Sequence, residues 1–225
     1  MNDMDKQVII LGGQGTGTIF ASALLDAQAR GATSYRFAGF LNDRMETGSE
    51  LEGFPVLGPL DAWRDFDEHY VFINTILRID GNMHRIQRVD ALGIPDHRLA
   101  TFVHPLAFVA HNVVLGPGVF IMPFAAVSPS TQLGKGTLVM AGVTIGHDNV
   151  VGAYCHFAAQ SCVGSYLTIG AGVHIGLNAT VREHLTIGDY GALGMGAVLL
   201  CDMGPGEIWA GNPARFLRRV DNETD

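Results

Sequence analysis

An aliphatic or aromatic residue recurs at every sixth position from residue 103 to residue 199, which is the strongest constraint on how this chain can fold. These seventeen anchor positions are Val103, Val109, Leu115, Ile121, Val127, Leu133, Val139, Ile145, Val151, Phe157, Val163, Ile169, Ile175, Val181, Ile187, Leu193 and Leu199. A period of six fits neither an α-helix nor a two-sided strand. It fits a chain wound into flat-sided coils, in which each side is one short strand with one inward residue. Three hexads then make one triangular coil, and neighbouring coils stack about 4.8 Å apart.

Two further places in the hexads carry small residues. Glycine directly follows the anchor at Gly116, Gly134, Gly146, Gly152, Gly164, Gly170, Gly176, Gly188 and Gly194. We expect these glycines at corners, where a side chain would be crowded or φ would be positive. The fifth residue of the hexad is mostly small or aliphatic, as at Ala107, Val113, Val119, Ala125, Thr131, Thr137 and Val143. This residue is also predicted to point inward, so that polar groups are confined to the outer faces and corners.

The repeat occupies only the second half of the chain, so we predict two domains, residues 1–100 and 101–225. In the first domain, residues 8–11 read as a buried strand, followed by a glycine-rich turn and a helix over 19–30. Further strands are predicted at 35–41 and 70–74, with a short helix around Trp63 and a helix over 79–92. This order is typical of a small Rossmann-like layer with a parallel sheet.

Polar residues and glycines gather at the predicted carboxyl ends of these strands. A glycine-rich turn before a helix suits a phosphate, although it also serves as a plain connection. Asn and Asp at strand ends bond sugar hydroxyls or simply form turns. Because these ends meet at one edge of a parallel sheet, a single ligand site is favoured. Its candidate residues are Gly13, Gln14, Gly15, Thr16, Asn42, Asp43 and Asn74.

The composition limits the classes of binding partner and the cellular compartment that we expect. A net charge of -8 argues against binding a nucleic-acid backbone. No apolar run approaches the roughly 20 residues of a membrane-spanning helix, and the acidic N-terminal residues do not resemble a secretory signal. Three cysteines, Cys155, Cys162 and Cys201, fit a reducing compartment and lack paired metal-ligand spacing. We therefore expect a soluble, cytoplasmic protein.

Histidine stands out among the polar residues of the repeat, at His104, His111, His147, His156, His174 and His184. His156 and His174 are one full coil apart and share one place in the hexad, so they are predicted to stack on one edge. His147 is followed by Asp148, whose carboxylate would select one tautomer of the imidazole and raise its basicity, as a general base requires. Neighbouring residues of a strand point in opposite directions, so this pairing requires Asp148 to sit at a corner.

Three segments give the chain a specific resemblance: HPLAFV at 104–109, GHDNVVGAYCHF at 146–157 and WAGNPAR at 209–215. Together with the hexads, they resemble the left-handed β-helix acyltransferases. Residues 6–219 are most similar to bacterial sugar acetyltransferases that place a Rossmann-like nucleotide-sugar domain before the β-helix. This group comprises the bacillosamine-pathway and perosamine N-acetyltransferases and the sialic acid O-acetyltransferases. The left hand of the helix is implied by the resemblance, since the period does not set it.

The resemblance also implies roles for individual residues. His147 matches the proton acceptor, Asp148 matches the carboxylate that raises its basicity, and His156 matches a histidine that contacts acetyl-CoA. Other matches are Gly176, Leu177, Gly194 and Met195 along the pantetheine arm, and Gln14, Gly15, Thr16, Asn42 and Asp43 on the sugar nucleotide. The family often has histidine in place of Thr16 and glycine in place of Asn74. These departures leave the sugar and the nucleotide open.

The implied reaction is direct acetyl transfer from acetyl-CoA to an amine, with His147 as base and a backbone N–H of Gly164 or Ser165 as candidate oxyanion donor. We favour N-acetylation of a nucleotide-linked 4-amino-4,6-dideoxy sugar, in glycan or polysaccharide biosynthesis. The alternative is O-acetylation of sialic acid or a related sugar. A covalent acyl-cysteine on Cys155 or Cys162 is disfavoured, because both are predicted at inward or near-anchor places where a thiol is inert.

Two rival functions come from other classes. The γ-class carbonic anhydrases share the β-helix and bind zinc through three histidines, two of them separated by four residues. The separations between His147, His156, His174 and His184 are 9, 18 and 10 residues, so no metal is expected. The other rival is a non-catalytic trimeric scaffold. In the favoured function the protein is also a homotrimer, which would bury Val150, Val151, Tyr154 and Phe157 with the site between subunits.

Overall fold

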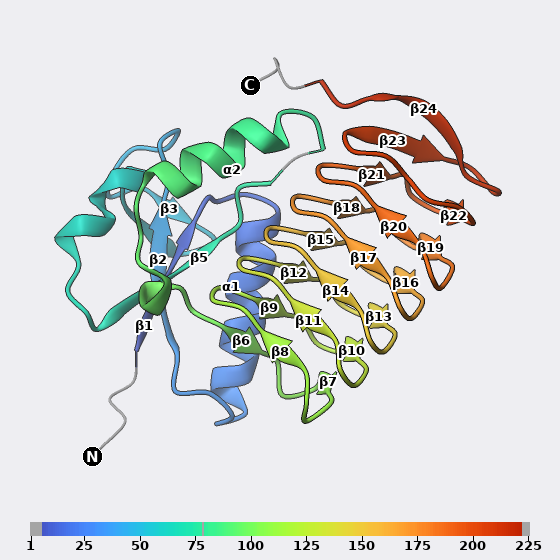
Figure 1. Ribbon diagram of the computed structural model, residues 1–225. Coiled ribbons are helices and arrows are strands. Elements are labelled where there is room, and N and C mark those ends of the chain that lie inside the picture. Colours follow the sequence, from blue (N-terminus) through green and yellow to red (C-terminus); the bar gives the residue numbers. More distant parts are fainter. Residues whose placement is uncertain (1–5, 78, 222–225) are drawn as a thin grey trace.

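A computed structural model describes residues 6–77 and 79–221. The first part of the chain forms a five-stranded sheet with helices, and the second part forms a stack of three-sided coils made of short parallel strands (Figure 1). The predicted combination of an α/β layer and a parallel β-helix is therefore confirmed.

The N-terminal sheet has the strand order β3-β4-β2-β1-β5. Its strands are β1 (Gln7–Leu11), β2 (Arg36–Leu41), β3 (Glu50–Leu51), β4 (Phe54–Gly58) and β5 (Tyr70–Asn74). β1 is parallel to β2 and β5, and β4 is parallel to β2, but β3 is antiparallel to β4. The prediction of a purely parallel sheet is wrong at this edge, because the sequence pattern does not reveal a strand of two residues followed by one that contains Pro55.

Four helical segments accompany the sheet: α1 (Thr16–Ala29), the 3-10 helix η1 (Leu60–Asp65), α2 (Asn82–Ala91) and the 3-10 helix η2 (Asp96–Arg98). α1 begins earlier than predicted, directly after Gly15, whose φ is 78°. α2 begins later than predicted, after Gly81, which is left-handed with φ 68°. Within the described ranges, no helix combines the length and the apolar character that a membrane crossing requires.

The coils have three faces. The first face consists of β6 (Phe102–Val103), β9 (Phe120–Ile121), β12 (Leu138–Val139), β15 (His156–Phe157), β18 (His174–Ile175), β21 (Ala192–Leu193), β23 (Glu207–Ala210) and β24 (Arg215–Arg219). The second face consists of β7 (Phe108–Val109), β10 (Ala126–Val127), β13 (Thr144–Ile145), β16 (Cys162–Val163), β19 (Thr180–Val181) and β22 (Val198–Leu199). The third face consists of β8 (Val114–Leu115), β11 (Gln132–Leu133), β14 (Val150–Val151), β17 (Thr168–Ile169) and β20 (Thr186–Ile187). From β6 to β22, strand neighbours are parallel and one coil apart in sequence, as His156 beside His174 illustrates, whereas β24 closes the first face as an antiparallel partner of β23.

The inside of the coils is a continuous apolar core. Every anchor from Ile121 onward is buried, as predicted. Val103 is 36% exposed, because the first coil has no coil before it to cover its end. Two buried threonines at the fifth place satisfy their hydroxyls on the backbone: Thr131 donates to the Gly146 carbonyl at 2.8 Å and Thr137 to the Gly152 carbonyl at 3.2 Å.

The glycines that follow the anchors are required by crowding. A Cβ atom on Gly152 would lie 2.6 Å from the Ala171 nitrogen of the next coil. Positive φ is found instead at the third residue after the anchor, for example Asp148 at 55° and Tyr154 at 58°. Of the two reasons predicted for these glycines, crowding is confirmed and positive φ is wrong. The left-handed residue turns the chain from one face to the next.

The N-terminal part covers the first face of the coils and the corner that precedes it. Phe20 of α1 stacks on Phe120 of β9, with ring centroids 4.2 Å apart. Asn82 of α2 donates to the Gly172 carbonyl at 3.0 Å, and Tyr154 hydrogen-bonds to Asp90. The corner between the second and third faces, which we call the outer corner, lies on the side away from α1 and α2 (Figure 1).

Candidate active site

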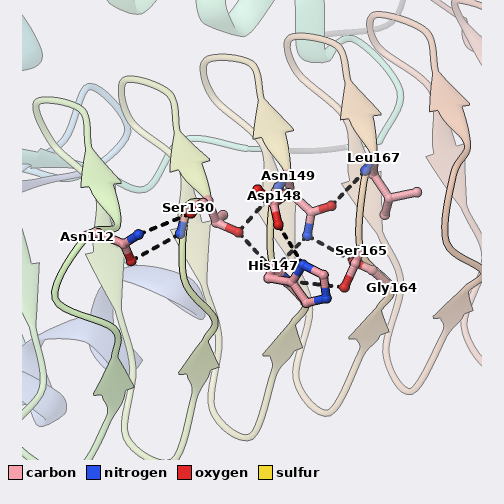
Figure 2. A network of polar contacts seen from close by, with 10 residues as sticks. Asn112, Ser130, His147, Asp148, Asn149, Gly164, Ser165 and Leu167 are labelled. Atoms are coloured by element: carbon pink, nitrogen blue, oxygen red, sulfur yellow. Dashed lines mark hydrogen bonds and ion pairs between the residues drawn. The ribbon is translucent and has the colours of Figure 1, made fainter.

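His147 and Asp148 lie together at the outer corner, between β13 and β14. The Nδ1 atom of His147 is 2.6 Å from the Oδ2 atom of Asp148, and both side chains are about half exposed, at 48% and 46%. The left-handed φ of Asp148 turns its carboxylate to the same side as the imidazole ring, which meets the condition set by the sequence. Figure 2 shows the other ring nitrogen of His147 pointing away from the carboxylate. That nitrogen is therefore free to exchange a proton with a ligand outside the corner.

Asn149 fixes the backbone around this pair. Its side chain is fully buried, and its Nδ2 donates to the carbonyls of Gly146 at 2.8 Å and Gly164 at 2.9 Å. Its Oδ1 accepts from the Leu167 nitrogen at 2.8 Å (Figure 2). Asn149 was not predicted as a site residue. The signal was present, because Asn149 occupies the fifth place of its hexad, which is elsewhere mostly apolar or small.

The two candidate oxyanion donors lie one coil beyond His147. The Gly164 nitrogen already donates to the Val181 carbonyl at 2.9 Å within the coil ladder, so Gly164 does not supply a free N–H. The Ser165 hydroxyl accepts from the His147 backbone nitrogen at 3.1 Å, which places Ser165 directly beside His147. Ser165 is the better placed of the two.

An aromatic stack, also not predicted, borders His147. The Tyr166 ring meets the His147 ring edge-on at 5.0 Å and stacks on His184 at 4.7 Å. Tyr166 is 51% exposed. Tyr166 occupies the same positive-φ position as Asp148, one coil later. The stacking of the coils therefore brings the Tyr166 ring beside the His147 ring.

His156 and His174 form a second cluster on the first face. Their strands β15 and β18 are neighbours in register, and their Nδ1 atoms are 3.0 Å apart. The predicted stack is therefore confirmed. Both rings line a cavity of about 150 Å³ together with Thr16, Leu77, Ile79 and Asn82 of the N-terminal part. This cavity joins the predicted ligand loop to the coils.

Burial lowers the pKa of both rings in this cavity. The pKa of His156 falls to about 3, through burial first and the nearby His174 second, and burial lowers the pKa of His174 to about 4. Both rings are therefore neutral near neutral pH. Two neutral imidazoles that face each other through Nδ1 form a hydrogen bond only if one of the two atoms carries the proton.

These shifts predict a pH-dependent stability. In the unfolded chain both histidines regain the ordinary pKa of 6.5, so the unfolded state takes up protons first. The free energy of unfolding is therefore highest above pH 6.5 and decreases as the pH falls toward the pKa values of the two histidines in the folded protein. We expect the free energy of unfolding to drop by about 3 kcal/mol between about pH 6.5 and about pH 5, measured by urea denaturation. A double leucine variant of His156 and His174 should lose less over this range, and an equal loss in both proteins would contradict the account.

The predicted ligand loop lies at the carboxyl end of β1. Asn42 donates to the Gly12 carbonyl at 3.1 Å, and a Cβ on Gly13 would lie 2.5 Å from the Asn42 Nδ2 atom. Asn42 and Gly13 therefore shape the turn as much as they face a ligand. Gln14 and Gly15 are exposed, and Thr16 opens α1 at the cavity.

The other two predicted contacts of this edge have partners of their own. Asp43 accepts from the Leu60 nitrogen at 2.7 Å and pairs with Arg88. Asn74 pairs with Leu11 in the sheet and is 6% exposed. Its Oδ1 accepts from the Ile76 nitrogen at 2.9 Å, and its Nδ2 has no partner among the described residues. The structure thus gathers the predicted residues at one edge of the sheet.

Leu177 and Met195 form an exposed row at the corner between the first and second faces, which we call the apolar corner. They are 51% and 75% exposed. Gly176 and Gly194 precede them and pack tightly on the next coil: a Cβ on Gly176 would lie 2.6 Å from the Leu193 carbonyl oxygen. The row begins directly after β18, beside the histidine cavity.

Three residues predicted to face another subunit are buried within the chain. Val151 and Phe157 belong to the coil core, with 4% and 0% exposure. Tyr154 is 6% exposed and is covered by α2. Only Val150 is exposed, at 50%. Val151 and Phe157 are buried because anchors point into the coil. Tyr154 is buried because the corner between the third and first faces packs against the N-terminal part.

The two cysteines near the site differ. Cys155 is buried, and burial raises the pKa of its thiol to about 12. Cys162 stands next to an anchor, as predicted, but it is exposed on the second face, so its expected burial is wrong, because the residue before an anchor points outward.

This difference predicts selective thiol labelling. Iodoacetamide should modify Cys162 and Cys201, which are exposed, and spare Cys155, because the thiolate is the reactive form. Peptide mass spectrometry of native and urea-unfolded protein measures this. Native labelling of Cys155 at the rate of Cys162 would contradict it.

The His147 corner and the histidine cavity do not meet within one chain. The cavity lies on the first face, and the outer corner is the one opposite that face. Among residues 6–77 and 79–221, no group of three or more His, Cys, Asp or Glu side chains is placed to hold a metal ion.

The chain is similar to one protein family model and to several solved structures. Residues 112–147 match the family model of the bacterial transferase hexapeptide, six repeats. A comparison with curated proteins finds no match. Among solved structures, the acetyltransferase domain of PglB from Neisseria gonorrhoeae, in complex with acetyl coenzyme A, is 28% identical; the match covers 95% of this chain and 100% of that one, with a TM-score of 0.80.

Two further structures match over similar lengths. PerB from Caulobacter crescentus, in complex with CoA and GDP-perosamine, is 25% identical over 94% of this chain and 97% of that one, with a TM-score of 0.79. WeeI from Acinetobacter baumannii is 24% identical over 94% and 100%, with a TM-score of 0.78, and shows the shared fold. The chain is thus a left-handed parallel β-helix with a small mixed N-terminal sheet, and its predicted resemblance to the hexapeptide-repeat sugar acetyltransferases is confirmed.

Proposed function

We propose that this protein is an acetyl-CoA-dependent N-acetyltransferase that acts on a nucleotide-linked amino sugar of the 4-amino-4,6-dideoxy class. The observation that carries the proposal is the His147–Asp148 pair, 2.6 Å apart at an exposed corner. It lies in a fold whose solved relatives include an acetyltransferase domain with acetyl coenzyme A and an enzyme with CoA and GDP-perosamine.

In the proposed reaction the sugar amine attacks the thioester carbonyl carbon. His147 accepts the amine proton on Nε2, while Asp148 holds Nδ1–H and stabilises the positive charge that forms on the ring. The backbone N–H of Ser165 is the proposed donor to the carbonyl oxygen as it becomes negative. When the C–S bond breaks, His147 returns the proton to the departing thiolate. The balance is one N–C bond formed and one C–S bond broken.

The donor is proposed to lie along the apolar corner. Leu177 and Met195 present exposed apolar surface to its pantetheine arm, and the row ends beside the cavity that contains His156. The His156 Nε2 atom is buried and has no hydrogen-bond partner among the described residues. A polar atom in that state suits a ligand that supplies the missing hydrogen bond, such as the acyl carbonyl oxygen.

The separation of the outer corner from the cavity supports a site shared between chains. We propose a closed three-fold ring in which the outer corner of one subunit faces the apolar corner and cavity of the next. Exposed apolar side chains are available for such an interface, including Phe108, Val114, Phe124 and Val150. We therefore propose a homotrimer in which His147 of one chain acts on substrates held by its neighbour.

A product assay tests the proposed function. Purified protein is mixed with acetyl-CoA and, in turn, with UDP-, dTDP- and GDP-linked 4-amino sugars, with the corresponding 4-hydroxy sugar nucleotides as matched controls, and with sialic acid. We expect thiol release and an acetylated product with one of the amino sugars only. Acetylation of sialic acid would replace the proposal with O-acetylation. Failure to bind acetyl-CoA by calorimetry would favour the scaffold.

A further inference from the structure

The contact between His156 and His174 links the positions of the protons on the two imidazole rings. Their Nδ1 atoms are 3.0 Å apart, on strands in register. Because both rings are neutral, only one of these two atoms carries a proton. The proton on Nδ1 of one ring therefore determines which nitrogen of the other ring is protonated, and so what that ring presents to the cavity.

Two arrangements satisfy the contact. If His174 donates, the His156 proton lies on Nε2 and His156 offers an N–H to the cavity. If His156 donates, its Nε2 is a bare acceptor. The Nε2 atom of His156 is buried without a partner among the described residues, so the choice decides which kind of ligand atom can complete it.

Asn82 favours the first arrangement. It lies on the wall of the same cavity, 7% exposed, and its Nδ2 donates to the Gly172 carbonyl at 3.0 Å, which fixes the orientation of the amide. Its Oδ1 is a buried acceptor with no partner among the described residues. If His156 presented a bare nitrogen, two acceptors would line one small cavity; a His156 N–H instead gives the cavity one donor and one acceptor.

We propose that His174 is a positioning residue: its Nδ1–H donates to Nδ1 of His156 and thereby holds His156 as the Nε2–H donor for the acyl carbonyl oxygen. The ligand part of this inference rests on the proposed function, because a thioester carbonyl is an acceptor only. The tautomer part concerns the ligand-free protein and stands without it.

The tautomer is measured on the ligand-free protein by nitrogen-15 NMR of the histidine rings, with assignment from single histidine variants. The expected result near neutral pH is a protonated Nδ1 on His174 and a protonated Nε2 on His156. A protonated Nδ1 on His156 would overturn the proposal, whether or not the protein acetylates a sugar.

Kinetics test the consequence. His174→Leu removes the donor, whereas His174→Asn keeps an amide N–H near the position of Nδ1. We expect the leucine variant to lose about tenfold in kcat/KM for acetyl-CoA and the asparagine variant to regain most of it. His111→Leu, an exposed histidine of the first coil, is the control and should keep full activity.

A double-variant cycle separates positioning from folding. In a His156→Ala background, His174→Leu should cost little more, because its effect acts through His156. An equal loss in both backgrounds, or no difference between leucine and asparagine, would overturn the proposal. If wild-type protein releases no thiol with any amino sugar, the proposed function fails and the NMR result alone judges the tautomer.

Discussion

Replacing His147 with alanine should lower kcat for acetyl transfer by about a thousandfold, the usual contribution of a positioned general base. KM for acetyl-CoA should change little, because the proposed contacts with the pantetheine arm come from Leu177 and Met195 and not from His147. Steady-state thiol release measures both constants. The size of the effect follows from the exposed Nε2 of a ring whose other nitrogen is held 2.6 Å from Asp148.

Two variants serve as controls for this result. Asp148→Asn keeps the side-chain shape but removes the charge that stabilises the imidazolium, so we expect a smaller loss, about tenfold or more. His111→Ala removes an exposed histidine from the outer corner two coils earlier and should leave kcat unchanged. Full activity in His147→Ala would remove His147 as the base.

Replacing Phe157 with alanine should lower the free energy of unfolding by about 3–5 kcal/mol. Phe157 is an anchor with 0% exposure and lies in the middle of the coil stack, where neighbouring coils cannot close around the cavity it would leave. Urea denaturation followed by circular dichroism provides the measurement.

Phe216→Ala is the matched control, because it removes the same atoms from a side chain that is 49% exposed and is not among those proposed for the trimer interface. We expect its cost in the single chain to be well below that of Phe157→Ala. Similar losses at the two positions would contradict the assignment of Phe157 to the coil core.

The period of six residues predicts the coils because each anchor obeys a local rule that repeats without insertion. The same rule places His156 beside His174, since both precede an anchor and lie one coil apart. It fails at Val103, where the coil stack begins, and the expectation of a buried thiol fails at Cys162, which precedes an anchor and points outward. Periodicity therefore predicts the interior well and the ends poorly.

The site was less predictable, because it depends on contacts between segments far apart in sequence. No local pattern places Thr16 and Asn82 in one cavity with His156; the docking of α1 and α2 does this. Asn149 was visible only as an exception at its hexad place. The β3–β4 hairpin was missed because β3 has only two residues. The position of Asp148 was predictable in part, because its pairing with His147 requires Asp148 to lie at a corner of the coil.

Subunit mixing tests most directly whether the proposed site is completed between chains. One variant carries His147→Ala; the other carries Thr16→Trp, which fills the cavity and leaves the outer corner intact. Each alone should be inactive. After the two are unfolded and refolded together, random assembly should restore about a quarter of wild-type activity, because half of the corners and half of the cavities are intact. No recovery, with mixed trimers confirmed by native mass spectrometry, would contradict a site shared between chains.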